Sequence, residues 1–164
     1  MQIRIATVDE MKRLWEYSDS PTYNYFVDGI NNGNIEFWAI EDKESNKLIG
    51  ELYIFWNSED PDEADGVNRA YLCAFRIEKQ FRGRGLSSKL MKSVLARVKE
   101  NGFSEVTIGI DNDNYEKLKN VYISWGFNVL IKQQHYDYHY LDSNNNPVYY
   151  EEPCDLYLNR LQQT

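Results

Sequence analysis

The amino-acid sequence predicts an α/β (α+β) protein with a mixed, mostly antiparallel, twisted sheet of about seven strands and helices on both faces. The first observation behind this prediction is the order of hydrophobic patterns, which reads β-α-α-β-β-β-α-β-α-β-β. The second is that strand–helix–strand units occur in the second half, where a helical crossover pairs strands in parallel. The third is that short polar turns join other strands, which favours antiparallel pairing.

Length and composition indicate one globular domain spanning residues 1–164. The 164 residues are 42% hydrophobic and 27% charged, and no repeat or linker divides them. The chain has no apolar run of about 18 residues, no signal-peptide pattern and only two cysteines. We therefore expect a cytoplasmic protein without a membrane partner. The net charge of −8 disfavours a nucleic-acid partner and weakly favours cationic small molecules.

In the first half, strands are recognised by alternation and helices by apolar side chains at helical spacing. In chain order, the expected elements are a strand (3–7), a helix (8–18), a short aromatic helix or turn (20–34), two strands (36–42 and 48–56) and an acidic loop (57–69). We expect the aromatic segment to end at Gly29 and the following NNGN. The acidic loop is long enough to suggest either a role or disorder.

The second half alternates strands and helices before a closing hairpin. The expected elements are an apolar strand (70–77), a helix (85–102), a strand (103–111), a helix (114–125) and a hairpin (127–142 and 148–161). The helix at 85–102 carries its apolar side chains on one stripe, which predicts that this face packs on the sheet.

The turn Gln80-Phe81-Arg82-Gly83-Arg84-Gly85 lies between the central strand and that helix. Gly83 and Gly85 permit backbone angles that other residues avoid and allow a ligand to approach the main chain closely. The helix start adds unpaired N–H groups and the positive end of its dipole, so the turn suits a phosphate or pyrophosphate. The alternative is a strand-to-helix turn in which the glycines only relieve steric conflict.

Two common nucleotide motifs do not fit this turn. Ser88 stands where a G-x-G-x-x-G fingerprint needs its third glycine, and the G-x-x-x-x-G-K-[ST] pattern is absent. A third pattern, Gln/Arg-x-x-Gly-x-Gly/Ala between a strand and a helix, is matched fully. At the end of the next helix, Tyr122 is followed by Gly126-Phe127 in the segment YISWGF.

With these two motifs and this element order, the chain resembles the GNAT family of N-acetyltransferases over nearly its whole length. The resemblance implies the GNAT acyl-CoA fold and acetyl-CoA as co-substrate. It implies that main-chain amides of the turn hold the pyrophosphate, that the preceding strand pairs with pantetheine, and that Tyr122 protonates the departing thiolate. The alternative for Tyr122 is packing between helix and sheet.

The resemblance assigns cofactor contacts residue by residue. The implied positions are Phe75, Arg76, Ile77, Gln80, Arg82, Gly83, Arg84, Gly85, Leu86, Ser87, Asn114 and Tyr122. One position departs from the family pattern, which often has an asparagine seven residues before the tyrosine. Residue 115 is a tyrosine here, and Asn114 lies one residue early.

The chemistry also requires that the acceptor amine lose a proton and that an oxyanion be stabilised. A main-chain N–H near residues 75–77 is the expected oxyanion donor. Glu51, on the strand at 48–56, and Asp111, at the end of the strand at 103–111, are the candidates for the general base, because a side chain at either place can face the cleft. Each has an alternative as a surface or capping group, and deprotonation through water is a further alternative.

Other conspicuous residues are assigned structural roles. His135, Asp137 and His139 alternate along one strand, but about 13 Å separates the two histidine Cα atoms, which is awkward for one metal ion. We therefore expect no metal and instead expect these residues to form a paired-strand face near the acceptor cleft. Cys73 lies in an apolar strand, where a small core residue is favoured over a covalent acetyl-cysteine, and Cys154 has no basic neighbour.

The resulting hypothesis is an N-acetyltransferase that transfers acetyl from acetyl-CoA to a primary amine of a small molecule, by direct attack in a ternary complex. The alternatives are a protein N-terminal or lysine acyltransferase and an acyl-CoA sensor without turnover. Retention of Tyr122 argues against the sensor. Dimers are common in the family, so a homodimer is included among the expected partners, although no residue requires one.

Overall fold

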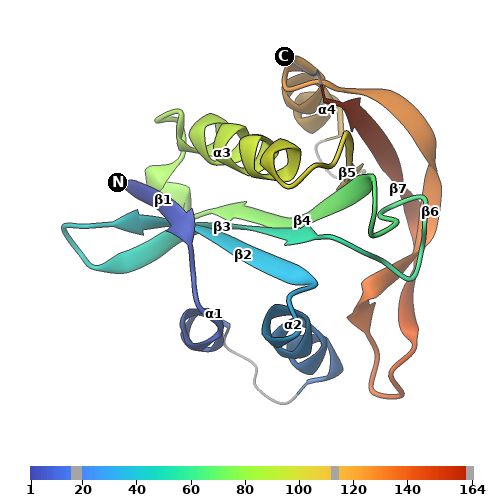
Figure 1. The fold of residues 1–164 in the computed structure, drawn as a ribbon, viewed down its shortest axis with the longest axis horizontal. Helices are drawn as coiled ribbons and strands as arrows, with labels where there is room; N and C mark the ends of the chain where they lie inside the picture. The colour runs from blue at the N-terminus through green and yellow to red at the C-terminus, as the bar shows by residue number, and fades with distance from the viewer. Residues whose placement is uncertain (16–19, 112–114, 162–164) are drawn as a thin grey trace.

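A computed structural model of the chain describes residues 1–15, 20–111 and 115–161. It contains one seven-stranded sheet with the order β1-β2-β3-β4-β5-β7-β6 and helices on both faces (Figure 1). The strands are β1 (Gln2–Ile5), β2 (Ile35–Asp42), β3 (Lys47–Phe55), β4 (Arg69–Ile77), β5 (Glu105–Ile110), β6 (Phe127–Leu141) and β7 (Pro147–Arg160). The helices are α1 (Val8–Leu14), α2 (Pro21–Asn31), α3 (Leu86–Glu100) and α4 (Tyr115–Ser124), with a 3-10 turn, η1, at Lys79–Phe81.

The pairing of the strands confirms the predicted mixed sheet. Only the β4–β5 pair of the described sheet is parallel, and its register runs from Arg69 opposite Glu105 to Leu72 opposite Ile108. All the other neighbouring strands in this sheet pair antiparallel. The parallel pair arises because α3 carries the chain from the end of β4 back to the start of β5.

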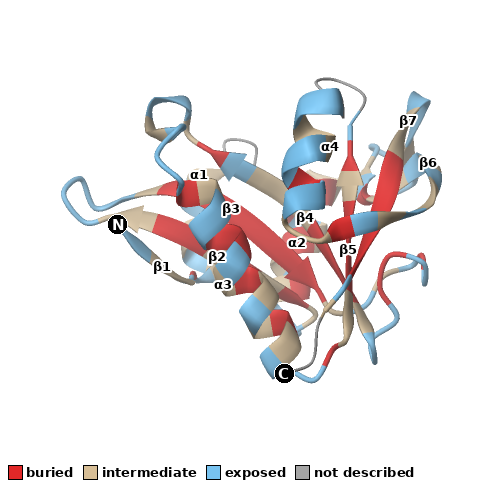
Figure 2. Cartoon of the chain, turned by 90° about the horizontal axis from the view of Figure 1, so that it is seen from above, coloured by how far each residue is buried: buried red, intermediate tan, exposed pale blue. Residues whose placement is uncertain are grey.

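Each face of the sheet has its own hydrophobic core. Helices α3 and α4 cover one face with side chains such as Leu90, Val94 and Tyr122 (Figure 1). Helices α1 and α2 cover the other face with side chains that include Met11 and Phe26. The central strands are buried on both faces, while the outer sides of α3 and α4 are exposed (Figure 2).

The helix starts differ in how their N–H groups are satisfied. Thr7 and Glu10 form a reciprocal capping box at α1, and the Ser20 hydroxyl accepts the Tyr23 N–H at α2. Helix α3 begins after Gly85, and no described side chain caps it. Of the expected end signals of the aromatic segment, Gly29 lies inside α2, and the helix ends at Asn31, the first residue of the NNGN segment.

A β-bulge in β4 interrupts the regular pairing near the middle of the sheet. Glu51 lies opposite Arg76 and Tyr53 lies opposite Cys73, so β4 has one residue more than β3 between these pairs. Ala74, inside the bulge, has a positive φ of 55°. The described pairing of β4 with β5 ends at Leu72, so the strands part beyond this point and leave a gap in the sheet.

The β6–β7 hairpin extends beyond the sheet and curves toward α2 (Figure 1). The Thr22 hydroxyl in α2 accepts the Leu141 N–H at 2.9 Å and lies 3.3 Å from the Leu141 carbonyl oxygen. The acidic loop at 57–68 also contacts the hairpin, because the Lys132 ammonium lies 2.7 Å from the Asp60 carboxylate. In the described part of the chain, no helix has both the length and the apolar character needed to cross a bilayer.

Candidate active site

A groove of about 470 Å³ lies where β4 parts from β5, between the glycine turn and α4. Most of the cofactor positions expected from the sequence meet in this groove: Phe75, Arg76, Ile77, Arg82, Gly83, Leu86, Ser87 and Tyr122. Residues from α4, including Lys117 and Trp125, form its other wall. The structure therefore brings together two motifs that are far apart in the sequence.

The turn before α3 has the geometry that an anion site requires. Gly83 and Gly85 have φ values of +79° and +75°, and a Cβ atom at either position would meet nothing within 4 Å. The Arg82 guanidinium donates from Nε to the Ile77 carbonyl at 2.9 Å, which fixes the path of the turn. Because α3 has no side-chain cap among the described contacts, its first N–H groups are available to a phosphate.

Three of the expected cofactor residues do not line the groove, and one lies outside the described residues. The Gln80 amide donates to Glu78 at 3.1 Å, and Arg84 lies over the Phe81 ring at 5.2 Å from its centroid. Gly85 shapes the turn as the residue before α3. Asn114 is the expected position that falls outside the described ranges.

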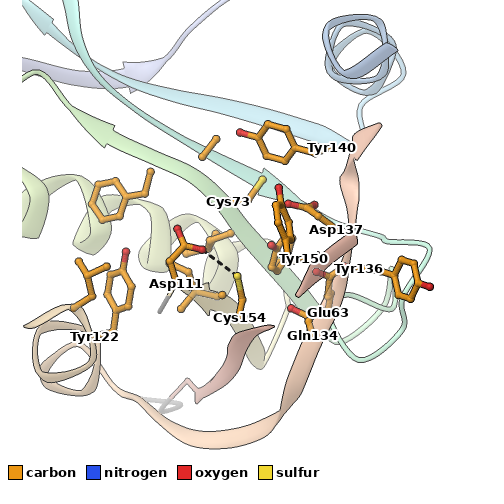
Figure 3. A pocket seen from close by; sticks show the side chains of 17 residues that line it. Glu63, Cys73, Asp111, Tyr122, Gln134, Tyr136, Asp137, Tyr140, Tyr150 and Cys154 are labelled. Atoms are coloured by element: carbon orange, nitrogen blue, oxygen red, sulfur yellow. Dashed lines mark hydrogen bonds between the residues drawn. The ribbon is translucent and has the colours of Figure 1, made fainter. Parts of the chain in front are cut away.

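A second cavity, of about 320 Å³, adjoins the groove and contains both cysteines (Figure 3). Its walls come from β4, β5, α4, β6, β7 and the acidic loop. Phe75, Leu118 and Tyr122 line this cavity as well as the groove. A group bound in either space can therefore reach the same three side chains.

Tyr122 is held in α4 at the junction of the two spaces. It is 8% exposed and packs against Trp125 and Phe127. Burial, and then the nearby Asp111 carboxylate, raises the pKa of Tyr122 to about 12. The phenol therefore stays protonated near neutral pH, as a hydrogen-bond donor must.

Glu51 lies on the α1/α2 side of the sheet beside the β4 bulge, where it lines a third cavity of about 440 Å³ that also contains Phe75. Its carboxylate is 2.9 Å from the Arg76 guanidinium and accepts the Tyr53 hydroxyl at 2.9 Å. Burial raises the pKa of Glu51, although Arg76 and Tyr53 act in the opposite direction. A carboxylate with a raised pKa next to a cleft has the character of a general base.

Asp111 lies at the end of β5, in the second cavity. It accepts a hydrogen bond from the Cys154 thiol at 3.0 Å (Figure 3). Burial and then this contact raise the pKa of Cys154 to about 12, and burial raises the pKa of Cys73 as well. Both thiols therefore remain protonated and weakly nucleophilic, which favours direct transfer over an acetyl-cysteine.

The structure identifies acidic and aromatic residues of the second cavity to which the sequence patterns gave no individual role. Glu63 from the acidic loop and Asp137 from β6 both line the second cavity, together with Tyr71 from β4. Tyr140 lines the second and third cavities. The only signal in the sequence was the tyrosine-rich hairpin, which does not reveal which side chains face inward.

The conspicuous histidines do not form a metal site. Within the described ranges, no group of three or more His, Cys, Asp or Glu side chains is arranged to hold a metal ion. His135 instead stacks on Tyr149, and its Nδ1 atom lies 3.0 Å from the Tyr150 carbonyl oxygen. His139 is buried, and its Nε2 atom lies 3.0 Å from Glu63.

A sheet that parts beside a glycine turn, with one tyrosine facing a groove and a cavity, defines the class of acyl-CoA-dependent transferases. The model of the Acetyltransferase (GNAT) family matches residues 4–127, so the chain belongs to this family. The protein is thus an acetyltransferase with acetyl-CoA as co-substrate. No curated protein matches the chain in sequence.

Solved structures share this fold at low sequence identity. An aminoglycoside 6'-acetyltransferase type Ii has a TM-score of 0.68 and 15% identity, with 100% of this chain and 99% of that chain covered. An aminoglycoside 6'-N-acetyltransferase complexed with coenzyme A has a TM-score of 0.64 and 14% identity, covering 100% and 99%. A GNAT family acetyltransferase from Elizabethkingia anophelis with acetyl-CoA bound has a TM-score of 0.61 and 16% identity, covering 98% and 97%.

Proposed function

We propose that the protein acetylates a primary amine of a small molecule by direct attack in a ternary complex. The observation that supports this most strongly is that Phe75 and Tyr122 line both the groove and the second cavity. The two substrates can therefore occupy adjacent spaces at the same time. Both cysteines are unpaired thiols, which fits the cytoplasmic location that we also propose.

The residues of the groove fit the co-substrate. The turn at Gly83 and the uncapped start of α3 present N–H groups that suit a pyrophosphate, and the unpaired edge of β4 suits the pantetheine amides. When bound there, acetyl-CoA supplies an acetyl thioester. Main-chain N–H groups of β4 that face the gap are placed to donate to an oxygen on which negative charge develops.

The remaining residues, Glu51, Asp111 and Tyr122, are candidates for proton transfer. The amine nitrogen must form a bond to the acetyl carbon while the carbon–sulfur bond breaks, so one proton leaves nitrogen and one reaches sulfur. We assign deprotonation of the amine to Glu51 or Asp111, directly or through water, and proton donation to sulfur to Tyr122. The raised pKa of Glu51 favours it over Asp111, which is more exposed.

The role of Glu51 predicts how the rate depends on pH. The base must be ionised, so activity should be present above the raised pKa of Glu51 and lost as the pH falls through it. Below that pKa, each pH unit should lower kcat/KM about tenfold. Glu51→Gln should reduce the rate by roughly tenfold or more and remove this acid limb.

The measurement is kcat/KM between pH 5 and 9 for Glu51→Gln, with Glu44→Gln as control because Glu44 is exposed in a turn. The control should keep the wild-type profile. If Glu51→Gln retained the same acid limb as the wild type, Glu51 would not be the base, and the same experiment with Asp111→Asn would test the other candidate.

The shape of the second cavity supports a small acceptor. Its volume of about 320 Å³ is near the lower end for small-molecule sites, and residues of the β6–β7 hairpin form part of its wall. Thr22 at the start of α2 holds the end of the hairpin by two contacts to Leu141. A polypeptide acceptor would instead need an open channel across this surface.

The proposed function is tested by measuring release of coenzyme A thiol from acetyl-CoA with a panel of small primary amines and with peptides. We expect turnover with small amines and little with peptides that offer an N-terminus or a lysine. Faster turnover with the peptides would favour a protein acyltransferase. Binding of coenzyme A without turnover on any amine would favour a sensor.

Gly109 provides a variant that probes the acceptor side alone. It lies in β5 on the wall of the second cavity, where an added Cβ would be 3.9 Å from the Tyr71 hydroxyl and 4.0 Å from the Cys154 Cβ. The Cβ of Gly109→Val therefore fits, and its methyl groups extend into the cavity. We expect kcat/KM for the best small amine to fall by roughly 10- to 100-fold, with coenzyme A affinity unchanged.

Gly109→Ala serves as the graded control and should have a smaller effect in the same direction. Affinity for coenzyme A can be measured by calorimetry for all three proteins. If Gly109→Val left kcat/KM unchanged, the acceptor would not enter this cavity.

A further inference from the structure

Among the residues that the structure describes, those lining the second cavity combine negative charge and aromatic rings with no positively charged side chain. None of the 17 side chains that line it belongs to a lysine, an arginine or a histidine. Three are carboxylates, from Glu63, Asp111 and Asp137, and several others are tyrosines. Figure 3 shows Asp111 toward the same side as Tyr122, whereas Glu63 and Asp137 lie away from Tyr122 across the cavity.

Two of these carboxylates already have partners in side chains. The buried Glu63 carboxylate lies 3.0 Å from His139 Nε2 and accepts the Ser58 hydroxyl at 2.8 Å. Asp111 accepts the Cys154 thiol and lies close enough to Tyr122 to affect its pKa. Glu63 is therefore occupied by contacts within the protein, and Asp111 lies at the end of the cavity near Tyr122.

Asp137 differs from both. Its Oδ1 atom accepts the main-chain N–H of His139 at 2.9 Å, which orients the carboxylate. In the described part of the chain it forms no ion pair, although it is half-buried and burial raises its pKa. The tyrosines of the cavity supply ring faces, which attract cations, and Tyr150 is among those drawn beside Asp137 in Figure 3.

Resting on the proposed function, we propose that the acceptor is a small diamine whose second, charged amine is bound by Asp137. One end of such a molecule, neutral when it reacts, lies at Tyr122 and Phe75. The other end stays an ammonium ion, donates to the Asp137 carboxylate and lies against tyrosine rings. A monoamine of the same length would fill the cavity but would leave Asp137 without a cation.

The test compares binding of 1,4-diaminobutane and butylamine, measured by calorimetry with protein saturated by coenzyme A, which cannot transfer acetyl. We expect the wild type to bind the diamine roughly 10- to 100-fold more tightly than the monoamine. Asp137→Asn keeps the size of the side chain and an oxygen for the His139 N–H, and should bring the two affinities close together. Glu152→Gln removes the same charge from an exposed position on β7 outside the cavity, and should preserve the difference.

The outcomes separate this proposal from the proposed function. If the wild type binds both amines equally, or if Asp137→Asn keeps the wild-type preference, the diamine proposal is overturned even when amines are acetylated. If the preference exists and depends on Asp137 but no amine is ever acetylated, the assignment of Asp137 as a binding site for an ammonium group stands and the proposed function fails. If Asp137→Asn does not fold, equal binding of the two amines by the wild type still overturns the proposal.

Discussion

Replacing Gly83 with valine is expected to weaken binding of coenzyme A by about 100-fold or more, while the protein stays folded. Gly83 has a φ of +79°, which a β-branched residue adopts only with strain, so the turn should change its path. Misplacing even two N–H groups that bind a charged phosphate costs about 3 kcal/mol or more. No neighbouring atom lies within 4 Å of the new Cβ, so packing is not disturbed.

Gly102 offers a matched control for this experiment. It has a φ of +87° and no neighbouring atom within 4 Å of the place a Cβ would take, but it follows α3 at the end remote from the groove. Gly102→Val should therefore show a comparable loss of thermal stability and a normal affinity for coenzyme A. Calorimetric titration of both variants with coenzyme A measures the two affinities. An unchanged affinity in Gly83→Val would show that this turn does not bind the phosphate.

Tyr122→Phe is expected to lower kcat by about 100-fold, because proton donation in the transition state contributes about that factor to the rate. Coenzyme A affinity is expected to change by no more than about threefold. Phenylalanine preserves the ring contacts with Trp125 and Phe127, so the junction of groove and cavity should keep its shape. Only the hydroxyl to which we assign proton donation is removed. The effect should therefore appear in turnover and not in binding.

Tyr149→Phe is the appropriate control, because Tyr149 is 55% exposed on the hairpin and does not line the cavity. It should behave as the wild type does. The measurement is single-turnover acetyl transfer across the pH range, together with the affinity for coenzyme A. Equal rates for Tyr122→Phe and the wild type at every pH would assign Tyr122 to packing alone.

The fold and the cofactor groove could be predicted because their signals are local. The order of helices and strands follows from periodicity, and all the predicted elements are present in that order. The turn at Gly83 and Gly85 is encoded within a few residues, and so is the Tyr122 motif. Their meeting in one groove follows from topology, because α3 places β5 and α4 beside β4.

The acceptor side could not be predicted in the same way, because it depends on contacts between distant segments. Glu63 and His139 meet only because the acidic loop folds against the curved hairpin. The side of β6 on which Asp137 lies depends on several register shifts between β6 and β7. Simple alternation grouped Asp137 with His135 and His139, yet only Asp137 of these three lines the cavity.

The β-bulge in β4 at Ala74 has a consequence for how the two substrates enter and leave the active site. Because the sheet is open there, the groove is reached past α3 and α4, while Glu51 and Trp15 border an approach from the opposite face. With coenzyme A in the groove and the amine in the second cavity, as we propose, we expect the two substrates to enter from different sides. We therefore expect that the acetylated amine and the thiol of coenzyme A leave independently and that no obligatory order of substrate binding is imposed.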